Sequence, residues 1–143
     1  MTRATRILLG TLTYAAVTFP LAYVWHLVVF AEQYDRLGAF TREEPVVALG
    51  FLVIVLQGVL LAVAFEAYTR GSASMRHALR FAFLAGTFLW SSQVVAFAAK
   101  SAVSSMASWL LIESVYFAIQ FALVGLAFGA LHSRAALQPA LDG

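Results

Sequence analysis

The stretch VVALGFLVIVLQGVLLAVAFEAY, residues 46–68, decides the fold of this 143-residue chain. It holds a single charged residue and is long enough to cross a bilayer, because a helix needs about 20 apolar residues to span about 30 Å of hydrocarbon. Three further stretches share this character, at residues 7–30, 78–99 and 106–131. The chain is 62% hydrophobic and 11% charged, whereas about a quarter of the residues in soluble domains are charged. The sequence therefore predicts one integral membrane domain with four spans.

Each span is predicted to be a helix, because an open sheet cannot satisfy its backbone edges in lipid. Polar and small residues recur every seven positions, which is nearly two helical turns and places them on one face. The fold class is therefore all-α, an antiparallel four-helix bundle. A weak internal repeat also suggests duplication of a two-helix hairpin. The matched segments are 26–31 with 93–98 and 57–65 with 120–128.

Glu113 is the one carboxylate predicted to lie well inside a span. Polar side chains in hydrocarbon usually face a bundle interior. At 1.5 Å per residue, Gln57 and Gln120 lie near the membrane midplane, and Gln93, Glu113 and His26 lie roughly 6–11 Å toward the outer face. These five residues are the candidate ligand-binding site. The alternative is structural: the glutamines are interhelical hydrogen-bond partners worth about 1 kcal/mol each, and Glu113 is a protonated, hydrogen-bonded carboxyl.

Signatures of other chemistry are absent from the sequence. It contains no cysteine, no Ser-His-Asp pattern, no phosphate-binding glycine loop and no H-E-x-x-H motif. His26 is predicted to lie across the bilayer from His77 and His132, which disfavours a bis-histidine haem. We therefore expect no enzyme activity, no metal and no cofactor. Nucleic-acid binding has no support either, because the basic residues are scattered at span ends.

The basic residues predict the orientation. Six lie on one side of the predicted membrane and three on the other, so the positive-inside rule puts both termini in the cytoplasm, at the inner membrane of a bacterium. Glu66, near the cytoplasmic end of its span, is expected to be an anchor that reaches water or Arg70. The six are Arg3, Arg6, Arg70, Arg76, Arg80 and Arg134, and the three are Arg36, Arg42 and Lys100.

On the residues from Tyr23 to Gly58 given below, the chain resembles, over nearly its whole length, a bacterial family of small four-span membrane proteins of unknown function. The resemblance implies the four-span topology and carries no activity or functional residue. The chain is similar to small four-span multidrug exporters in size only, because the first span lacks their glutamate. The residues that carry the family resemblance are Tyr23, Trp25, His26, Phe30, Tyr34, Leu37, Gly38, Arg42, Pro45, Gly50, Gln57 and Gly58.

Two functions follow as expectations. The first is a non-enzymatic protein that acts through helix–helix contacts, as an accessory subunit or a homo-oligomer. Gly125 and Gly129 form a small-xxx-small packing motif that suits contacts within the bundle or in a dimer. The alternative is a small transporter, or a binder of a small ligand or lipid, centred on Glu113. The expected partners are the lipid bilayer and either a second copy of the chain or a larger membrane complex.

Overall fold

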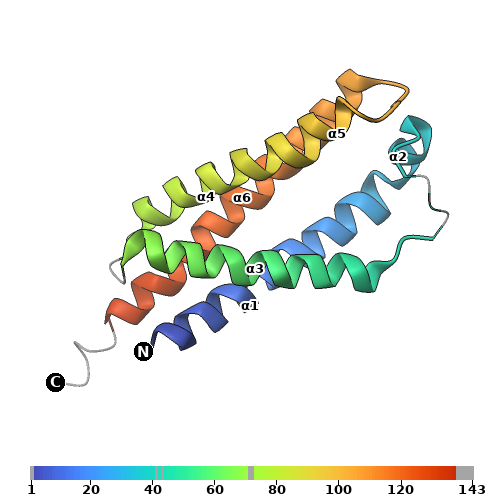
Figure 1. The fold of residues 1–143 in the computed structure, drawn as a ribbon. Coiled ribbons are helices and arrows are strands. Elements are labelled where there is room, and N and C mark those ends of the chain that lie inside the picture. Colours follow the sequence, from blue (N-terminus) through green and yellow to red (C-terminus); the bar gives the residue numbers. More distant parts are fainter. Residues whose placement is uncertain (1, 41, 43, 71–72, 138–143) are drawn as a thin grey trace.

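The computed structural model describes residues 2–40, 42, 44–70 and 73–137, and the regular secondary structure in this part of the chain is helical, with no strand. Four of its helices are long and apolar enough to cross a membrane. They pack against one another as a bundle (Figure 1). The predicted all-α four-helix architecture is therefore confirmed. The four candidate spans are Arg3–Val29, Val47–Thr69, Met75–Ala98 and Met106–His132.

The first and third spans are each built from more than one helical segment. The first consists of α1 (Arg3–Val24) and the π-helical turn η1 (Trp25–Val29). The third consists of α4 (Met75–Trp90), the π-helical turn η2 (Ser91–Val95) and α5 (Ala96–Ala98). The second and fourth spans are the single helices α3 (Val47–Thr69) and α6 (Met106–Leu137).

Two spans begin earlier than the hydropathy predicted, at Arg3 instead of residue 7 and at Met75 instead of residue 78. In both cases a hydroxyl caps the helix. The side chain of Thr2 accepts from the backbone N–H of Thr5, and the side chain of Ser74 accepts from that of His77. Such caps satisfy backbone donors that the first turn leaves unpaired, so a polar first turn remains helical.

The bundle consists of two hairpins that lie side by side. α1 packs mainly against α3, α4 packs mainly against α6, and contact between α1 and α6 joins the hairpins. α1 begins and α6 ends at the same end of the bundle, here called the N-terminal end (Figure 1). The opposite end carries the short helix α2 (Ala31–Leu37) and is here called the α2 end. The two hairpins are the units that the predicted duplication would relate.

Small residues let the helices of each hairpin approach closely. A Cβ atom added to Gly58 of α3 would lie 3.1 Å from the carbonyl oxygen of Thr11. A Cβ added to Gly125 of α6 would lie 3.0 Å from the Cβ of Ala82, and one added to Gly129 would collide with Met75. Both glycines of the predicted packing motif therefore face α4 of the same chain, where close approach is their role.

The two π-helical turns lie toward the α2 end, one in each hairpin. In η2 the cause is local: the hydroxyls of Ser91 and Ser92 donate to the carbonyls of Phe88 and Leu89 and compete with the backbone ladder. Trp109 then donates its indole N–H to the carbonyl of Val94 at 3.2 Å. π turns are frequent at functional sites. Here they carry two predicted site residues, His26 in η1 and Gln93 in η2.

The helix α2 was not predicted, although the turn at Leu37–Gly38 was. Gly38 ends α2 in the left-handed region with φ 65°, which glycine adopts without a steric penalty. Tyr34 is fully buried and Leu37 is 5% exposed, so α2 folds back onto the bundle. Ser104, from the other hairpin, donates its backbone N–H to the carbonyl of Leu37 and its hydroxyl to that of Arg36. α2 is thereby tied to both hairpins.

Candidate functional site

The five predicted site residues border one cavity of about 260 Å³ in the half of the bundle toward the α2 end. Each of the four spans contributes to it, since η1, α3, η2 and α6 carry them. The cavity therefore exists only when the two hairpins are together. The five are His26, Gln57, Gln93, Glu113 and Gln120, and Tyr14, Thr18, Phe40, Trp109 and Tyr116 are among the other residues that line it.

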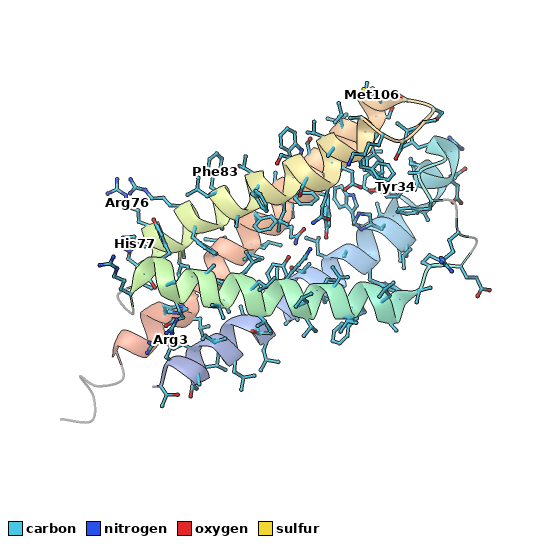
Figure 2. All side chains as sticks on the ribbon, in the orientation of Figure 1. Arg3, Tyr34, Arg76, His77, Phe83 and Met106 are labelled. Atoms are coloured by element: carbon cyan, nitrogen blue, oxygen red, sulfur yellow. The ribbon has the colours of Figure 1, made fainter. Side chains whose placement is uncertain are left out.

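Glu113 is the acidic residue at the centre of this cavity and is only 5% exposed. Its Oε1 atom accepts a hydrogen bond from the hydroxyl of Tyr34. The same oxygen lies 3.3 Å from Nε2 of His26. Tyr34 comes from α2, which packs at the end of the bundle where Figure 2 labels it. Three separate elements, η1, α2 and α6, therefore meet at the carboxyl group of Glu113.

His26 is held in one orientation. Its Nδ1 lies 2.9 Å from the carbonyl oxygen of Ala22, which can only accept, so Nδ1 carries a hydrogen and Nε2 is the nitrogen that faces Glu113. The ring stacks on Tyr34 with centroids 5.3 Å apart and meets the edge of Tyr116 at 4.6 Å. The aromatic packing and the backbone bond together fix the imidazole beside the carboxyl group.

Tyr14 is the centre of a second polar layer, deeper in the bundle. Its hydroxyl donates to Oε1 of Gln57 at 3.0 Å and accepts from Nε2 of Gln120 at 3.2 Å. The same Gln120 nitrogen lies 3.4 Å from the hydroxyl of Thr18. This layer connects α1, α3 and α6. Two of the predicted glutamines therefore have the structural role that the alternative interpretation assigned to them, while they also line the cavity.

Gln93 differs from the other two glutamines. Its side chain is exposed, and the structure gives it no hydrogen bond to any described residue. It lines the cavity from η2, at the side where the two hairpins meet. The interhelical role expected of Gln93 is therefore not what the structure shows. Its amide is available to a molecule in the cavity.

Tyr34 and Trp25 are functional candidates that the sequence analysis did not select. Burial first, and then the hydrogen bond to Glu113, raise the pKa of the Tyr34 hydroxyl above its ordinary value, so it remains a donor. The indole N–H of Trp25 is buried, and its interaction with the Tyr34 hydroxyl opposes part of this rise in pKa. Tyr34 lies in α2, which folds back onto the bundle, and Trp25 lies in η1, which precedes α2. No local pattern in the sequence predicts that α2 folds back.

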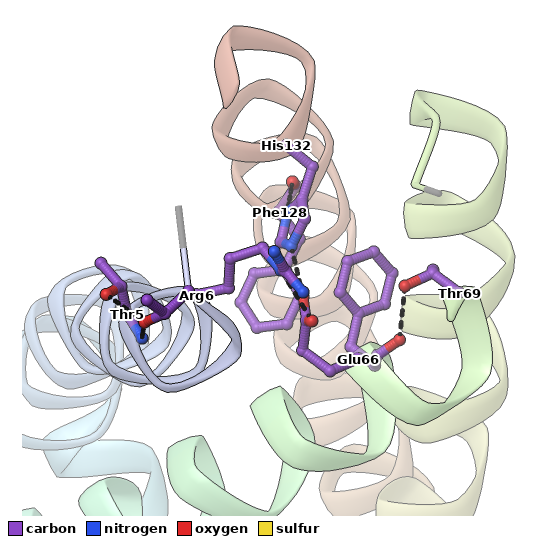
Figure 3. A network of polar contacts seen from close by, with 8 residues as sticks. Thr5, Arg6, Glu66, Thr69, Phe128 and His132 are labelled. Atoms are coloured by element: carbon purple, nitrogen blue, oxygen red, sulfur yellow. Dashed lines mark hydrogen bonds and ion pairs between the residues drawn. The ribbon is translucent and has the colours of Figure 1, made fainter. Parts of the chain in front are cut away.

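A second buried carboxylate lies at the N-terminal end, where Glu66 is 5% exposed. Figure 3 shows its partners: Nε of Arg6 lies 2.8 Å from Oε2, and Nε2 of His132 lies 3.1 Å from Oε1. The sequence analysis expected Glu66 to reach water or Arg70, and that expectation was wrong. Arg6, Glu66 and His132 come from different spans but lie at the same depth, which is the signal that could have paired them.

Glu113 and Glu66 are each paired with a histidine in the same geometry. His132 places Nδ1 2.9 Å from the carbonyl of Phe128, four residues earlier, as His26 does with Ala22. In both cases Nε2 faces a glutamate of another span. The buried rings of Phe65 and Phe128 belong to one apolar cluster, which packs between Tyr14 and the Glu66–His132 pair at the N-terminal end. The polar cavity is thus separated from Glu66 by an apolar layer.

Within the described residues, no group of three or more His, Cys, Asp or Glu side chains is placed to hold a metal ion. A larger hollow of about 450 Å³ lies between α4 and α6, and its lining is mostly apolar. Trp90 Nε1 donates to the hydroxyl of Ser114 at 3.0 Å, and the hydroxyl of Thr87 donates to the carbonyl of Phe83 at 2.8 Å. The groups capable of acid–base chemistry or charge recognition are therefore at the Glu113 cavity and at the Glu66 cluster.

Fold and cavity together define a class of protein: a bundle of four apolar, membrane-length helices with a carboxylate-centred polar cavity inside it. Comparison of the chain with protein-family models, curated proteins and solved structures finds no match. The resemblance to small four-span bacterial proteins therefore stays a prediction.

Proposed function

We propose that this protein binds a small, positively charged molecule in the Glu113 cavity and exchanges it for a proton, as a small transporter or ligand-binding membrane protein. The observation that carries the proposal is the convergence of Glu113, His26 and three glutamine amides on one cavity inside an otherwise apolar bundle. Ionisable groups at membrane depth are costly, and where they face a cavity they commonly mark a substrate or proton pathway.

The Glu113–His26 pair supports proton exchange. Because Nδ1 of His26 already donates to Ala22, the 3.3 Å contact between Nε2 and Oε1 is favourable only if one of the two groups carries a further proton. The pair is then neutral overall, as two uncharged groups or as imidazolium and carboxylate. A bound monocation that takes the place of this proton leaves the charge of the cavity unchanged. Such an exchange avoids the cost of burying a net charge.

The surroundings of the pair favour a cation over an anion. Of the residues that the structure describes, no lysine or arginine lines the cavity, and the one acid that does is Glu113. Aromatic side chains, including Tyr116, Trp109 and Phe40, border it. Aromatic faces attract organic cations, most strongly where water is excluded. A volume of about 260 Å³ lies below the range of about 300–1,000 Å³ typical of drug-sized ligands. The substrate class is therefore a small amine or quaternary ammonium ion.

The proposed setting is the inner membrane of a bacterium, with both termini in the cytoplasm. The excess of basic residues at the N-terminal end supports this orientation. The Glu113 cavity then lies in the outer half of the membrane, and the Glu66 cluster lies near the cytoplasm. The apolar layer around Phe65 and Phe128 keeps the two carboxylates apart.

The experiment uses choline, ethanolamine and tetramethylammonium as probes, with purified protein in neutral detergent. Binding is measured by isothermal titration calorimetry, and proton release by the pH change in weakly buffered solution. We expect Glu113→Gln to abolish both signals. Glu32→Gln is the matched control, because Glu32 lies on the same end but its side chain is 71% exposed. The neutral analogue 3,3-dimethylbutanol tests the need for charge. Equal binding of choline and this analogue, or unchanged binding by Glu113→Gln, would refute the proposal.

Contact with another membrane protein is a second candidate function, and the groove between α4 and α6 favours it. The groove is lined by Ala118 and Ala122, exposed small residues that would admit a further apolar helix. Gly125 and Gly129 no longer support this function, because they pack against α4 within the chain. Native mass spectrometry after gentle extraction tests it. A defined oligomer or complex that Ala118→Trp dissolves would support contact, and a monomer would contradict it.

A further inference from the structure

A second polar hollow lies at the N-terminal end and is separate from the Glu113 cavity. It is a cleft of about 310 Å³ between the start of α1 and the end of α3. Among the described residues, its lining contains three guanidinium groups and a single carboxylate, those of Arg3, Arg6, Arg70 and Glu66. Three positive charges against one negative charge leave an excess of two within a small volume.

The carboxylate cannot balance this excess, because both of its oxygens are engaged. Oε2 of Glu66 pairs with Arg6 and Oε1 with His132, as Figure 3 shows. Arg3 and Arg70 are exposed, and neither has an acidic partner among the described residues. Like charges that converge without a counter-charge repel each other. The cleft is therefore complementary to an anion.

The backbone adds to the positive potential. α1 begins at Arg3, and its first turn contains no acidic residue that would offset the partial positive charge of a helix N-terminus. Arg70 lies directly after α3 in the left-handed region, with φ 50°. Guanidinium groups bind phosphate oxygens in a bidentate manner, which suits two arginines that approach from different helices.

The position of the cleft indicates the source of the anion. Arg3 and Arg70 stand at the outer limits of the apolar helices α1 and α3, which is the depth of lipid headgroups. From Ala67, which lines the cleft, an exposed apolar stripe runs along α3 at helical spacing through Val63, Leu60 and Leu56. An acyl chain that descends from the cleft would cover this stripe.

From these observations we infer that the cleft binds the phosphate group of an anionic phospholipid in the leaflet at the N-terminal end, with Arg3 and Arg70 as its ligands and Arg6 held in place by Glu66. Basic pockets between membrane helices are a known mode of headgroup recognition. The site is independent of the proposed function, since it shares no lining residue with the Glu113 cavity.

Native mass spectrometry of protein from nanodiscs of phosphatidylglycerol and phosphatidylcholine, mixed one to three, tests the inference. We expect wild-type protein to retain phosphatidylglycerol in preference to phosphatidylcholine. Arg3→Gln and Arg70→Gln should each reduce that preference about fivefold, the effect of one basic residue at an anionic surface. Arg70→Lys should keep most of it, because the charge remains. Arg76→Gln is the control, since Arg76 is an exposed arginine at the same end but lies on α4, away from Arg3 (Figure 2).

Free phosphate is distinguished in a second arm, in which inorganic phosphate is titrated onto delipidated protein in neutral detergent and thermal unfolding is followed. Stabilisation by phosphate that Arg70→Gln removes, together with equal retention of both lipids, would overturn the lipid assignment in favour of a free phosphate. Equal retention of both lipids without any phosphate effect would overturn the site altogether. In the part of the chain that the structure describes, the side chains of Arg3 and Arg70 are exposed and form no hydrogen bond or ion pair, so their variants should unfold at the wild-type temperature.

Discussion

Replacement of Glu66 by glutamine tests whether the cluster at the N-terminal end holds three helices together. Glu66 of α3 bonds to Arg6 of α1 and to His132 of α6, and it is 5% exposed. Removal of one partner from a buried ion pair costs about 3–5 kcal/mol. The Arg6 side chain is 23% exposed and can turn toward water, so the cost falls below that range. We expect Glu66→Gln to lower the free energy of unfolding by about 2–3 kcal/mol.

The assay is equilibrium unfolding in mild detergent with increasing dodecyl sulfate, followed by circular dichroism. Glu32→Gln is again a suitable control, because the exposed pair of Glu32 with Arg36 on α2 should contribute about 0.3–0.5 kcal/mol. The double variant Arg6→Met/Glu66→Gln should lose less than the sum of the single variants, because the two side chains interact. A loss of less than about 0.5 kcal/mol in Glu66→Gln, comparable to an ordinary surface substitution, would refute this account of the cluster.

Three further outcomes are expected. The pKa of Tyr34 is raised in the folded state, so the stability that Tyr34 contributes is present below about pH 10 and is lost above that pH, where the tyrosine of the unfolded chain ionises. Ultraviolet titration should show one fewer late-ionising tyrosine in Tyr34→Phe. Gly125→Leu should cost about 1–3 kcal/mol by overpacking against α4 in dodecyl sulfate unfolding, and Gly50→Leu, which has nothing within 4 Å, should cost far less. Tyr14→Phe should cost about 1 kcal/mol in the same assay through its lost glutamine bonds, and Tyr68→Phe, at an exposed site, should cost little.

The four spans were predictable because membrane helices are a local property. A run of about 20 apolar residues must satisfy its own backbone in lipid, and a helix does so within the segment. The boundaries were less predictable, since Thr2 and Ser74 extend two helices through polar first turns by capping them. The two π-helical turns were missed as well, and η2 depends on the hydroxyls of Ser91 and Ser92 and on Trp109 from another helix.

The candidate site was predictable in part. Seven-residue spacing and depth selected His26, Gln57, Gln93, Glu113 and Gln120, and the structure arranges them around one cavity. The same reasoning could not find their partners. In a sequence, Tyr14 resembles an ordinary apolar residue of a span, and Tyr34 lies outside the predicted spans, yet they make the central hydrogen bonds of the two polar layers.

The error over Glu66 has a physical reason. The sequence analysis considered Arg70, four residues later on the same helix, as its partner. The structure instead pairs Glu66 with Arg6 and His132, which are 60 and 66 positions away. Neighbours in sequence are limited by helix geometry to one face, whereas the buried face of α3 can be satisfied only by the helices packed against it.

By itself, the sequence determined that the chain forms four apolar helices, that they form an all-α bundle and which polar residues lie at which depth, because hydropathy and helical periodicity act within each segment. The tertiary structure alone decided which helices pair, that α2 folds back to place Tyr34 on Glu113, and that both buried glutamates face histidines from other spans. These features depend on contacts between residues far apart in the chain, and no local pattern encodes which of the apolar faces will meet.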